Sequence, residues 1–232
     1  MQFKIKPISE TNLIMYFGNE IDTHLAVNIG NISDNIRQNM TPKLIEVIPS
    51  YTSIMIEFNP LATSFDELTA QLTLFIKTHS TPSNTNAKTI ILPTYYDPDV
   101  GPDLKTIADI TNLSINEIIK IHSQTIYTVC AIGFAPGFAF LAKVDNKIAI
   151  KRHSKPRPLI PLGSVGIANQ QTAVYPSDSA AGWQIIGNCP IPLYTPNATS
   201  ISPFRVGNKV KFEPIDKSIY LRMGGAICKN WK

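Results

Sequence analysis

Two arginines and a histidine in one proline-rich loop are the side chains best suited to hold an anion. Arg152, His153 and Arg157 lie within a single short stretch that also carries prolines. An arginine guanidinium offers a planar fork of donors that matches a carboxylate or a phosphate, and proline restricts the backbone that presents it. We interpret the three residues as candidate catalytic residues that clamp an anionic group. Solvated surface charge is the alternative, and the sequence weighs the two evenly.

A second segment places two aromatic residues around a bare backbone. Pro136 and Gly137 lie between Phe134 and Phe138. Proline lacks the donor that a strand needs and glycine has no side chain to pack, so the pair predicts a tight turn. Aromatic rings beside accessible amides can wall a ligand cleft, which makes these four residues candidates for substrate binding. A hairpin whose rings only fill the core is the alternative, and the segment alone favours it.

Polar side chains in a third segment could bind the polar atoms of a ligand. Ser164, Gln171, Thr172, Tyr175 and Gln184 offer hydroxyl and amide groups. We add Ser164, Gln171, Tyr175 and the neighbouring Trp183 to the candidate substrate-binding set. For any one of them, an ordinary place in a turn or at a strand end is the favoured alternative.

The motifs of a self-sufficient enzyme are absent from the sequence. It contains no GxxxxGK(S/T) phosphate loop, no GxGxxG, no HExxH and no GxSxG. The four histidines show no metal-ligand spacing, so we predict no metal site. The alternative that this chain forms a catalytic apparatus jointly with another chain stays open.

The composition indicates a cytoplasmic protein. Charged residues make up only 16% of the sequence, which suggests a surface covered by another chain; a bias toward neutral polar residues explains the deficit equally well. The net charge of +4 is mild and the basic residues cluster locally, so we expect no nucleic acid binding. We find no signal peptide or membrane span, and three scattered cysteines are typical of reduced thiols.

The first part of the chain alternates strand and helix patterns. Runs of β-branched residues predict strands, apolar residues at helical spacing predict helices, and a Ser64/Glu67 capping box opens the second helix. The predicted strands are 3–5, 12–17, 44–49, 52–58 and 88–92, and the predicted helices are 21–40 and 64–79. We expect an α+β domain over residues 1–92, with the helices on one face of a sheet and a polar loop at 80–87.

The later part of the chain changes from helices to short strands. Helices 103–111 and 114–123 are expected to pack as a hairpin, and a DNA-reading helix-turn-helix is disfavoured because Lys105 and Lys120 are their only basic residues. Turn residues then separate predicted strands at 126–132, 147–151, 163–168, 172–175, 183–186 and 209–212. Short strands with frequent turns predict a closed or half-closed barrel over residues 93–232.

Together these segments resemble the KipI-like family, also called allophanate hydrolase subunit 1. The resemblance runs almost end to end, and its most specific motifs are the GFxPGFxYL-like segment at 133–141, the arginine-rich loop, PxGSVGIA at 161–168, QTxxYP at 171–176 and GWQxIG at 182–187. Four places depart from the family pattern. Asn169 replaces a glycine, and Gly187-Asn188-Cys189 replaces Gly-Arg-Thr after the tryptophan motif. His153 stands where the family usually has a second basic residue, and Ala180-Ala181-Gly182 replaces Pro-Gly-Gly before the tryptophan.

The resemblance implies an α+β N-terminal domain followed by a cyclophilin-like β-barrel domain. It implies ATP-driven opening of 5-oxo-L-proline to L-glutamate, as one subunit of a 5-oxoprolinase. An unactivated lactam is a poor electrophile, so phosphorylation of its oxygen must precede attack by water, and such a step needs cationic clamps. Arg152 and Arg157 are the expected clamps, with 134–138 as a cleft wall.

The implied partners are a KipA-like C-type subunit and a LamB/YcsF-like A-type subunit. ATP, accompanied by Mg²⁺, is expected at a site held jointly with a partner or by the partner. The isolated chain is also expected to form a homodimer through the surface that binds the C-type subunit. Three other functions stay open: an inhibitor of a sensor histidine kinase, an allophanate hydrolase or urea amidolyase-type subunit, and, on fold analogy alone, a prolyl isomerase.

Overall fold

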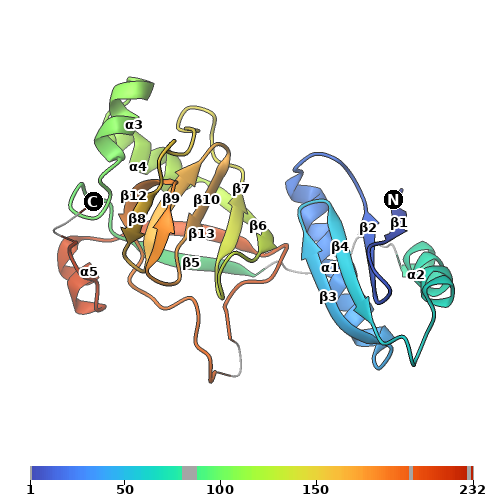
Figure 1. Ribbon diagram of the computed structural model, residues 1–232. Coiled ribbons are helices and arrows are strands. Elements are labelled where there is room, and N and C mark those ends of the chain that lie inside the picture. The colour runs from blue at the N-terminus through green and yellow to red at the C-terminus, as the bar shows by residue number, and fades with distance from the viewer. Residues whose placement is uncertain (1, 80–87, 199–200, 229–230, 232) are drawn as a thin grey trace. The chain divides into compact units, whose positions relative to one another are not determined.

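The computed structural model describes residues 2–79, 88–198, 201–228 and 231. The chain forms two compact units (Figure 1). The first unit is formed within Met1–Ala87 together with Arg205–Gly207, and the second within Lys88–Phe204 and Asn208–Lys232. Each unit has its own sheet and its own helices.

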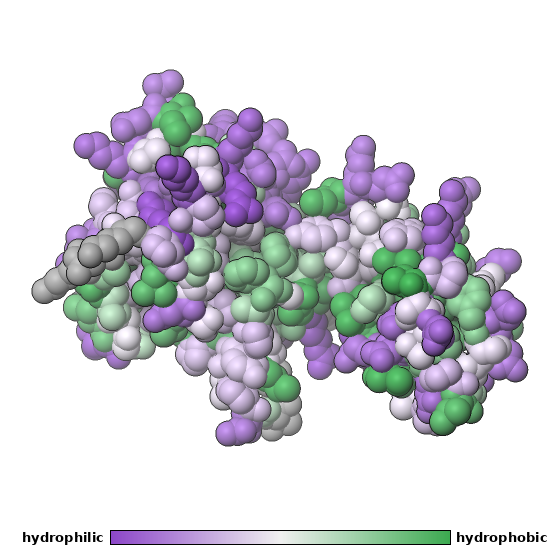
Figure 2. All heavy atoms as spheres, in the orientation of Figure 1, coloured by the Kyte–Doolittle hydropathy of each residue, from purple (hydrophilic) through white to green (hydrophobic). Residues whose placement is uncertain are grey.

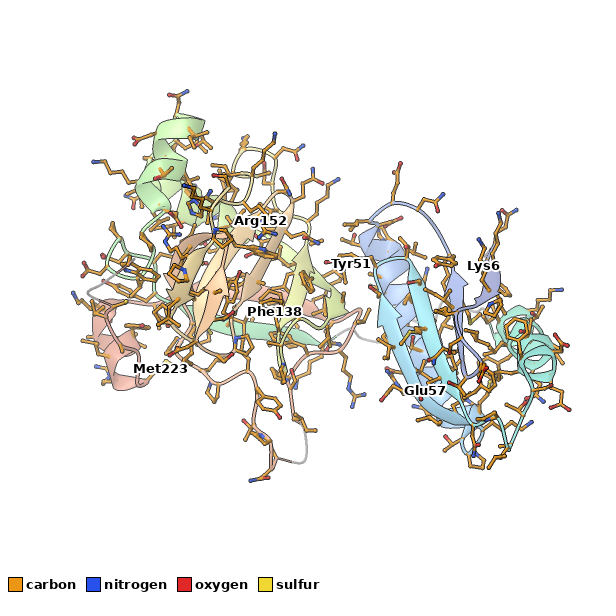
Figure 3. All side chains as sticks on the ribbon, viewed as in Figure 1. Lys6, Tyr51, Glu57, Phe138, Arg152 and Met223 are labelled. Atoms are coloured by element: carbon orange, nitrogen blue, oxygen red, sulfur yellow. The ribbon has the colours of Figure 1, made fainter. Side chains whose placement is uncertain are left out.

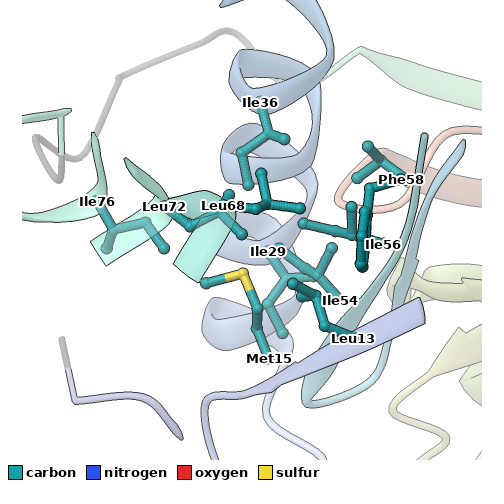
Figure 4. Packing of buried hydrophobic residues seen from close by; sticks show 11 residues of the cluster. Leu13, Met15, Ile29, Ile36, Ile54, Ile56, Phe58, Leu68, Leu72 and Ile76 are labelled. Carbon is teal, nitrogen blue, oxygen red and sulfur yellow. The ribbon is translucent and has the colours of Figure 1, made fainter. Parts of the chain in front are cut away.

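The first unit is a four-stranded antiparallel sheet covered by two helices on one face. Its elements are β1 (Lys4–Pro7), β2 (Asn12–Tyr16), α1 (Thr23–Met40), β3 (Leu44–Ser50), β4 (Ser53–Phe58) and α2 (Phe65–His79). The strand order is β1-β2-β4-β3. Alternate residues of β2 and β4 point into one core, which both helices share (Figure 4). Apart from the strand at 88–92, the strands and helices predicted for this part of the chain are present, and both helices pack on one core with the sheet.

Local sequence signals account for the starts of both helices. The side chain of Asp22 accepts a hydrogen bond from the His24 N–H at the start of α1. At α2, Glu67 N–H donates to Ser64 Oγ, and Ser64 N–H donates to the Glu67 carboxylate. These bonds satisfy backbone donors that have no partner inside the helix, and they confirm the predicted capping box.

The second unit is built around a seven-stranded barrel-like sheet. Its strands are β5 (Thr89–Thr94), β6 (Ile126–Ile132), β7 (Ala139–Ala142), β9 (Ser164–Ala168), β10 (Gln171–Val174), β12 (Gln184–Asn188) and β13 (Lys209–Pro214), in the order β12-β9-β10-β7-β6-β13-β5. Directly after β5, Tyr95 exchanges two hydrogen bonds of 2.9 Å with Asn188 at the end of β12. The two edges of the sheet therefore meet, which satisfies edge groups that would otherwise be open.

The strand predicted at 88–92 is present but belongs to the other unit, and the strand predicted at 147–151 is not formed. The strand predicted at 88–92 as the end of the N-terminal unit is β5, and it pairs in parallel with β13 of the barrel-like sheet. Its β-branched pattern showed a strand but not its partner, because parallel pairing joins segments that are far apart in sequence. The strand predicted at 147–151 is a turn followed by a single bridge at Ile150. There, Lys147 N–H bonds to the Asp145 side chain, so local turn chemistry outweighs strand propensity.

Short helices and a two-stranded ribbon complete the second unit. They are α3 (Leu104–Thr111), α4 (Ile115–Gln124), α5 (Lys217–Arg222), β8 (Arg157–Ile160) and β11 (Ser179–Ala181). Helices α3 and α4 pack together as predicted, and Ser114 forms the predicted capping box with Glu117. Figure 2 shows mainly hydrophilic residues over α3 and weakly hydrophobic ones over the middle of the unit.

The cysteines agree with the expectation of reduced thiols. None of the three described cysteines forms a disulfide, and Cys130 and Cys189 are buried. Within the described residues, no helix is both long enough and apolar enough to cross a bilayer.

A fully buried histidine lies in the core of the second unit. Tyr96 Oη lies 2.7 Å from Nδ1 of His122, whose Nε2 lies 2.9 Å from Thr172 Oγ1. The Thr172 hydroxyl donates to the Gly166 carbonyl, so a neutral imidazole that accepts from Tyr96 and donates to Thr172 satisfies every group. Burial lowers the pKa of His122 from 6.5 to about 3.

This pKa makes stability depend on pH. Below pH ~6.5 the unfolded chain protonates the imidazole, whereas the folded chain does so only near pH 3. The contribution of the neutral His122 to the free energy of unfolding is therefore fully present above pH ~6.5. It decreases as the pH falls from about 6.5 to about 3, by up to about 1.4 kcal/mol per pH unit. We expect His122→Gln to remove this part of the slope in urea unfolding between pH 6.5 and 4.

The control is His24→Gln, which changes an exposed imidazole on α1 and should keep the wild-type slope. An equal pH slope in the His122→Gln variant and the wild type would contradict the expectation.

Candidate functional site

A cleft of about 370 Å³ opens on the second unit. It contains aromatic rings, small residues and one arginine, and its lining residues are Phe134, Phe138, Phe140, Arg152, Pro156, Tyr175, Ala180, Ala181, Gly182 and Trp183. Phe138 and Arg152 are labelled in Figure 3. The structure thus brings together five of the candidates from the sequence, which come from three separate segments.

The turn between β6 and β7 supplies one wall of the cleft. Phe138 N–H donates to the Ala135 carbonyl at 3.0 Å, which confirms the predicted tight turn around Pro136 and Gly137. Gly137 has φ +83°, and a Cβ there would lie 2.5 Å from the Leu193 carbonyl oxygen, so only glycine fits. Phe134 also has a positive φ, 76°, and its ring remains 69% exposed. A bulky residue held in this conformation indicates a constrained and solvent-facing rim.

The aromatic wall is a cluster centred on Phe138. Its ring centroid lies 4.9 Å from Phe140, 5.2 Å from Phe134 and from Tyr175, and 5.9 Å from Trp183. All four contacts are edge-to-face, an arrangement that aromatic quadrupoles favour. Phe138 is buried, whereas Phe134 is exposed, so the cluster extends from the core to the cleft rim. Both alternatives considered from the sequence therefore apply within one cluster: Phe138 fills the core, and the exposed Phe134 forms part of the cleft wall.

Tyr175 brings a phenol to the aromatic wall. Burial raises the pKa of its hydroxyl well above the usual range, and the charge of Arg152 lowers it by a smaller amount. The phenol therefore stays protonated at neutral pH and acts as a hydrogen-bond donor, not as a base. Within the part of the chain that the structure describes, no hydrogen bond joins this hydroxyl to another residue.

Arg152 is the charged residue among those that line the cleft. Its side chain is exposed, and no ion pair or hydrogen bond to another described residue holds its guanidinium. The guanidinium lies close to the backbone of Gly182. A Cβ built on Gly182 would lie only 2.9 Å from Nη2 and 3.1 Å from Nε of Arg152. An available guanidinium beside aromatic rings suits a small ligand that has one carboxylate and an apolar body.

The close approach of Arg152 to Gly182 can be tested by adding a methyl group. Because the guanidinium ends a flexible side chain, we expect Gly182→Ala to displace it while changing stability by less than about 1 kcal/mol. The displaced guanidinium should weaken binding of a small carboxylate ligand by about 1 kcal/mol, which lowers the affinity by about 5-fold. Titration followed by Trp fluorescence measures the affinity and thermal unfolding measures the stability; unchanged affinity would show that the guanidinium position does not matter for binding.

Arg157 and His153 do not line the cleft. Nη1 and Nη2 of Arg157 donate to the two carboxylate oxygens of Asp103, at 2.8 and 2.7 Å. Nε2 of His153 lies 3.2 Å from the same carboxylate and 3.0 Å from Nη1 of Arg157. The Asp103 side chain is only 4% exposed. The clamp roles expected of Arg157 and His153 stay predictions, and in this structure both side chains face Asp103 instead of a ligand.

The remaining polar candidates lie in the barrel-like sheet instead of the cleft wall. Ser164 Oγ donates to the Pro161 carbonyl at 2.7 Å, and Gln171 pairs through its backbone with Ala142 and Ala168. Pro136 shapes the turn without lining the cleft. Their part in substrate binding stays a prediction.

Phe140 and Asp103 were missed by sequence reasoning, whereas Gln184 was considered there only as a possible polar contact to a ligand. Phe140 lines the cleft, and the alternation of aromatic residues after the turn could have indicated it. Asp103 was assigned only to the start of a helix. Gln184 donates to the Lys151 carbonyl at 3.0 Å, while its buried Oε1 has no partner within the described residues. No local sequence signal shows these last two contacts.

Comparisons with known proteins agree on one family. Residues 3–204 match the family described as carboxyltransferase domain, subdomain C and D. The chain is 32% identical over 230 residues to the B-type subunit of 5-oxoprolinase from Bacillus subtilis (strain 168), covering 95% of this chain and 96% of that protein.

Solved structures show a shared fold. The crystal structure of TTHA0988 has a TM-score of 0.78 and 28% identity, over 88% of this chain and 40% of that one, so this chain spans less than half of it. The Kluyveromyces lactis urea carboxylase has a TM-score of 0.71 at 16% identity, over 94% of this chain and 22% of that one. At this identity the likeness to urea carboxylase concerns the fold alone.

Proposed function

This chain belongs to the carboxyltransferase domain, subdomain C and D, family, and we propose that it is the B-type subunit of an ATP-dependent 5-oxoprolinase. In this role it contributes to the hydrolytic opening of 5-oxo-L-proline to L-glutamate. The name of the Bacillus subtilis relative, which aligns over nearly its whole length, supports the assignment. The urea carboxylase likeness extends only to the fold and favours a urea-directed function less.

The cleft with one available guanidinium is the observation that carries the proposal. 5-Oxo-L-proline is a small five-membered lactam with a single carboxylate. Arg152 can pair with that carboxylate, while Phe138 and Trp183 face the apolar ring atoms. The protonated Tyr175 hydroxyl can donate to a ligand oxygen. A cleft of about 370 Å³ is large enough for a ligand of this size.

ATP is proposed to bind jointly with a partner subunit or on the partner, together with Mg²⁺. A triphosphate needs several cationic contacts, whereas the cleft lining contains one arginine. Within the described residues, no three His, Cys, Asp or Glu side chains lie close enough together to hold a metal ion. This chain is therefore assigned the binding and orientation of the lactam, and the phosphoryl group comes from ATP.

The proposed assembly contains a KipA-like C-type subunit and a LamB/YcsF-like A-type subunit. The subunit designation of the relative supports a complex of several chains. The finer division of the fold, an α+β domain followed by a cyclophilin-like barrel domain, is part of the proposal and is supported by the two compact units. The homodimer of the isolated chain and the cytoplasmic location stay predictions.

Reconstitution of the complex tests the proposed function. We expect the chain mixed with its A-type and C-type subunits to release glutamate and phosphate from 5-oxo-L-proline and ATP, because activation of the lactam needs all parts of the site. The isolated, mass-verified chain should release neither product. Turnover by the isolated chain, or a complete complex without activity on 5-oxo-L-proline, would contradict the proposal.

A further inference from the structure

We propose that Asp103 is a positioning residue for the cleft, and that its buried carboxylate holds Arg152 in place without touching the substrate. The inference rests on the proposed function, since it concerns how the same cleft binds the carboxylate of 5-oxo-L-proline. Asp103 precedes α3 and is not part of the cleft lining. Its influence must therefore pass through the segments that it contacts.

The Asp103 carboxylate joins two segments that carry cleft residues. Arg157 donates to both of its oxygens, and His153 approaches one of them at 3.2 Å. These residues belong to the loop that presents Arg152. The second segment is β12, where Ile185 N–H donates to Oδ2 of Asp103 at 2.6 Å and the Ile185 carbonyl accepts from Asp103 N–H at 3.0 Å.

Two further hydrogen bonds tie the same segments together on either side of Arg152. His153 N–H donates to the Gly182 carbonyl at 2.6 Å. Gln184 Nε2 donates to the Lys151 carbonyl at 3.0 Å. The residues immediately before and after Arg152 are thus bonded to the residues immediately before and after Trp183. The backbone at Arg152 is held by these ties and by the loop contacts to Asp103.

The bonding of Asp103 is unusual for its place in the chain. It occupies the N-cap position of α3, where a carboxylate commonly caps the helix, yet its side chain makes no capping bond. Instead the carboxylate is buried and accepts hydrogen bonds at both oxygens. Burying a charge is costly unless it is paired and hydrogen-bonded, and the Arg157 fork with the Ile185 amide meets that need. An asparagine would lose the charge and present a donor to Arg157.

A double-mutant cycle in the reconstituted complex separates positioning from mere stability. We expect Arg152→Ala to raise KM for 5-oxo-L-proline by about 100-fold and Asp103→Asn to raise it by about 10-fold. If Asp103 acts through Arg152, the double variant should have a KM within about 2-fold of Arg152→Ala alone, because effects on one interaction are not additive. Multiplication of the two effects, or an unchanged KM in Asp103→Asn, would overturn the proposal.

Two more variants guard against a general loss of folding. Arg157→Lys keeps a cation beside the carboxylate but loses the paired fork, so it should raise KM less than Asp103→Asn does. Asp34→Asn is the matched control, since it breaks an exposed ion pair with Arg37 in the first unit and should leave KM unchanged. If Asp103→Asn does not fold, Arg157→Lys in the same cycle with Arg152→Ala decides the question.

A second readout needs no turnover. In the full chain with Trp231→Phe, Trp183 is the remaining tryptophan, and iodide and caesium ions quench its fluorescence according to the local charge. When Arg152 is held beside Trp183, its positive charge should make iodide a stronger quencher than caesium. Asp103→Asn should therefore lower the ratio of iodide quenching to caesium quenching, as Arg152→Ala does. If the complex is inactive on 5-oxo-L-proline but Asp103→Asn still lowers this quenching ratio, the proposed substrate is wrong and the positioning role of Asp103 is supported. An unchanged ratio in Asp103→Asn would reject the positioning whatever the substrate.

Discussion

Replacing Arg152 with alanine should lower kcat/KM of the reconstituted complex for 5-oxo-L-proline by about 100-fold, mostly through KM. Arg152 is the charged group among the cleft-lining residues, and no intramolecular ion pair between described residues occupies it. A hydrogen bond to a charged group contributes about 1.5–3 kcal/mol, and about 2.7 kcal/mol corresponds to about 100-fold. Steady-state kinetics with 5-oxo-L-proline as the varied substrate measure the change.

The control for this variant is Lys155→Ala. Lys155 is an exposed base in the same loop that does not line the cleft, so its removal should change kcat/KM by less than about 2-fold. Equal losses in both variants would show that only the general positive charge of the loop matters. Retention of more than about half the wild-type value in Arg152→Ala would exclude the carboxylate contact.

Arg157→Ala should destabilise the second unit by about 3 kcal/mol, lowering its Tm by about 10 °C. The Arg157 side chain is 18% exposed and the Asp103 side chain 4%, so the variant leaves a buried charge without its main partner. The sequence alone predicts an Arg157 whose loss affects activity and spares the fold. The structure leads us to expect a loss of stability as well.

Thermal and urea unfolding of the full chain measure this change. Lys217→Ala is the matched control, because it breaks an exposed ion pair with Asp99 in the same unit, where both side chains are more than half exposed. Such pairs contribute about 0–1 kcal/mol. A Tm of Arg157→Ala within about 2 °C of the control would contradict the expectation that the Asp103 pair is worth about 3 kcal/mol.

The sequence predicted most elements because their signals are local. Capping pairs at Ser64 and Ser114 and the apolar alternation of β2 and β4 involve neighbouring residues, and the structure agrees with them. The partner of β5 could not be predicted in the same way. A parallel pair is formed with a strand that lies far along the chain, and nothing within β5 specifies that strand.

The same distinction applies to the site. Phe134 and Phe138 flank a turn that is written in the sequence, and the structure places both at the cleft. The fate of Arg157 was not predictable, because its partner Asp103 lies 54 residues earlier and looks like an ordinary helix start. Arg152 and Arg157 are similar in sequence context. Only the folded chain shows that one is available and the other is paired.

The closure of the barrel-like sheet has a consequence for how the chain folds. Thr89 of β5 pairs with Lys209 of β13, about 120 residues later, and Tyr95 after β5 pairs with Asn188. A contact over this separation carries a large loop-closure entropy and forms late. During synthesis, β5 leaves the ribosome long before β13 and stays unpaired until β13 has been made. An unpaired strand is exposed to misassociation, and pairing of β5 with β13 ends that exposure.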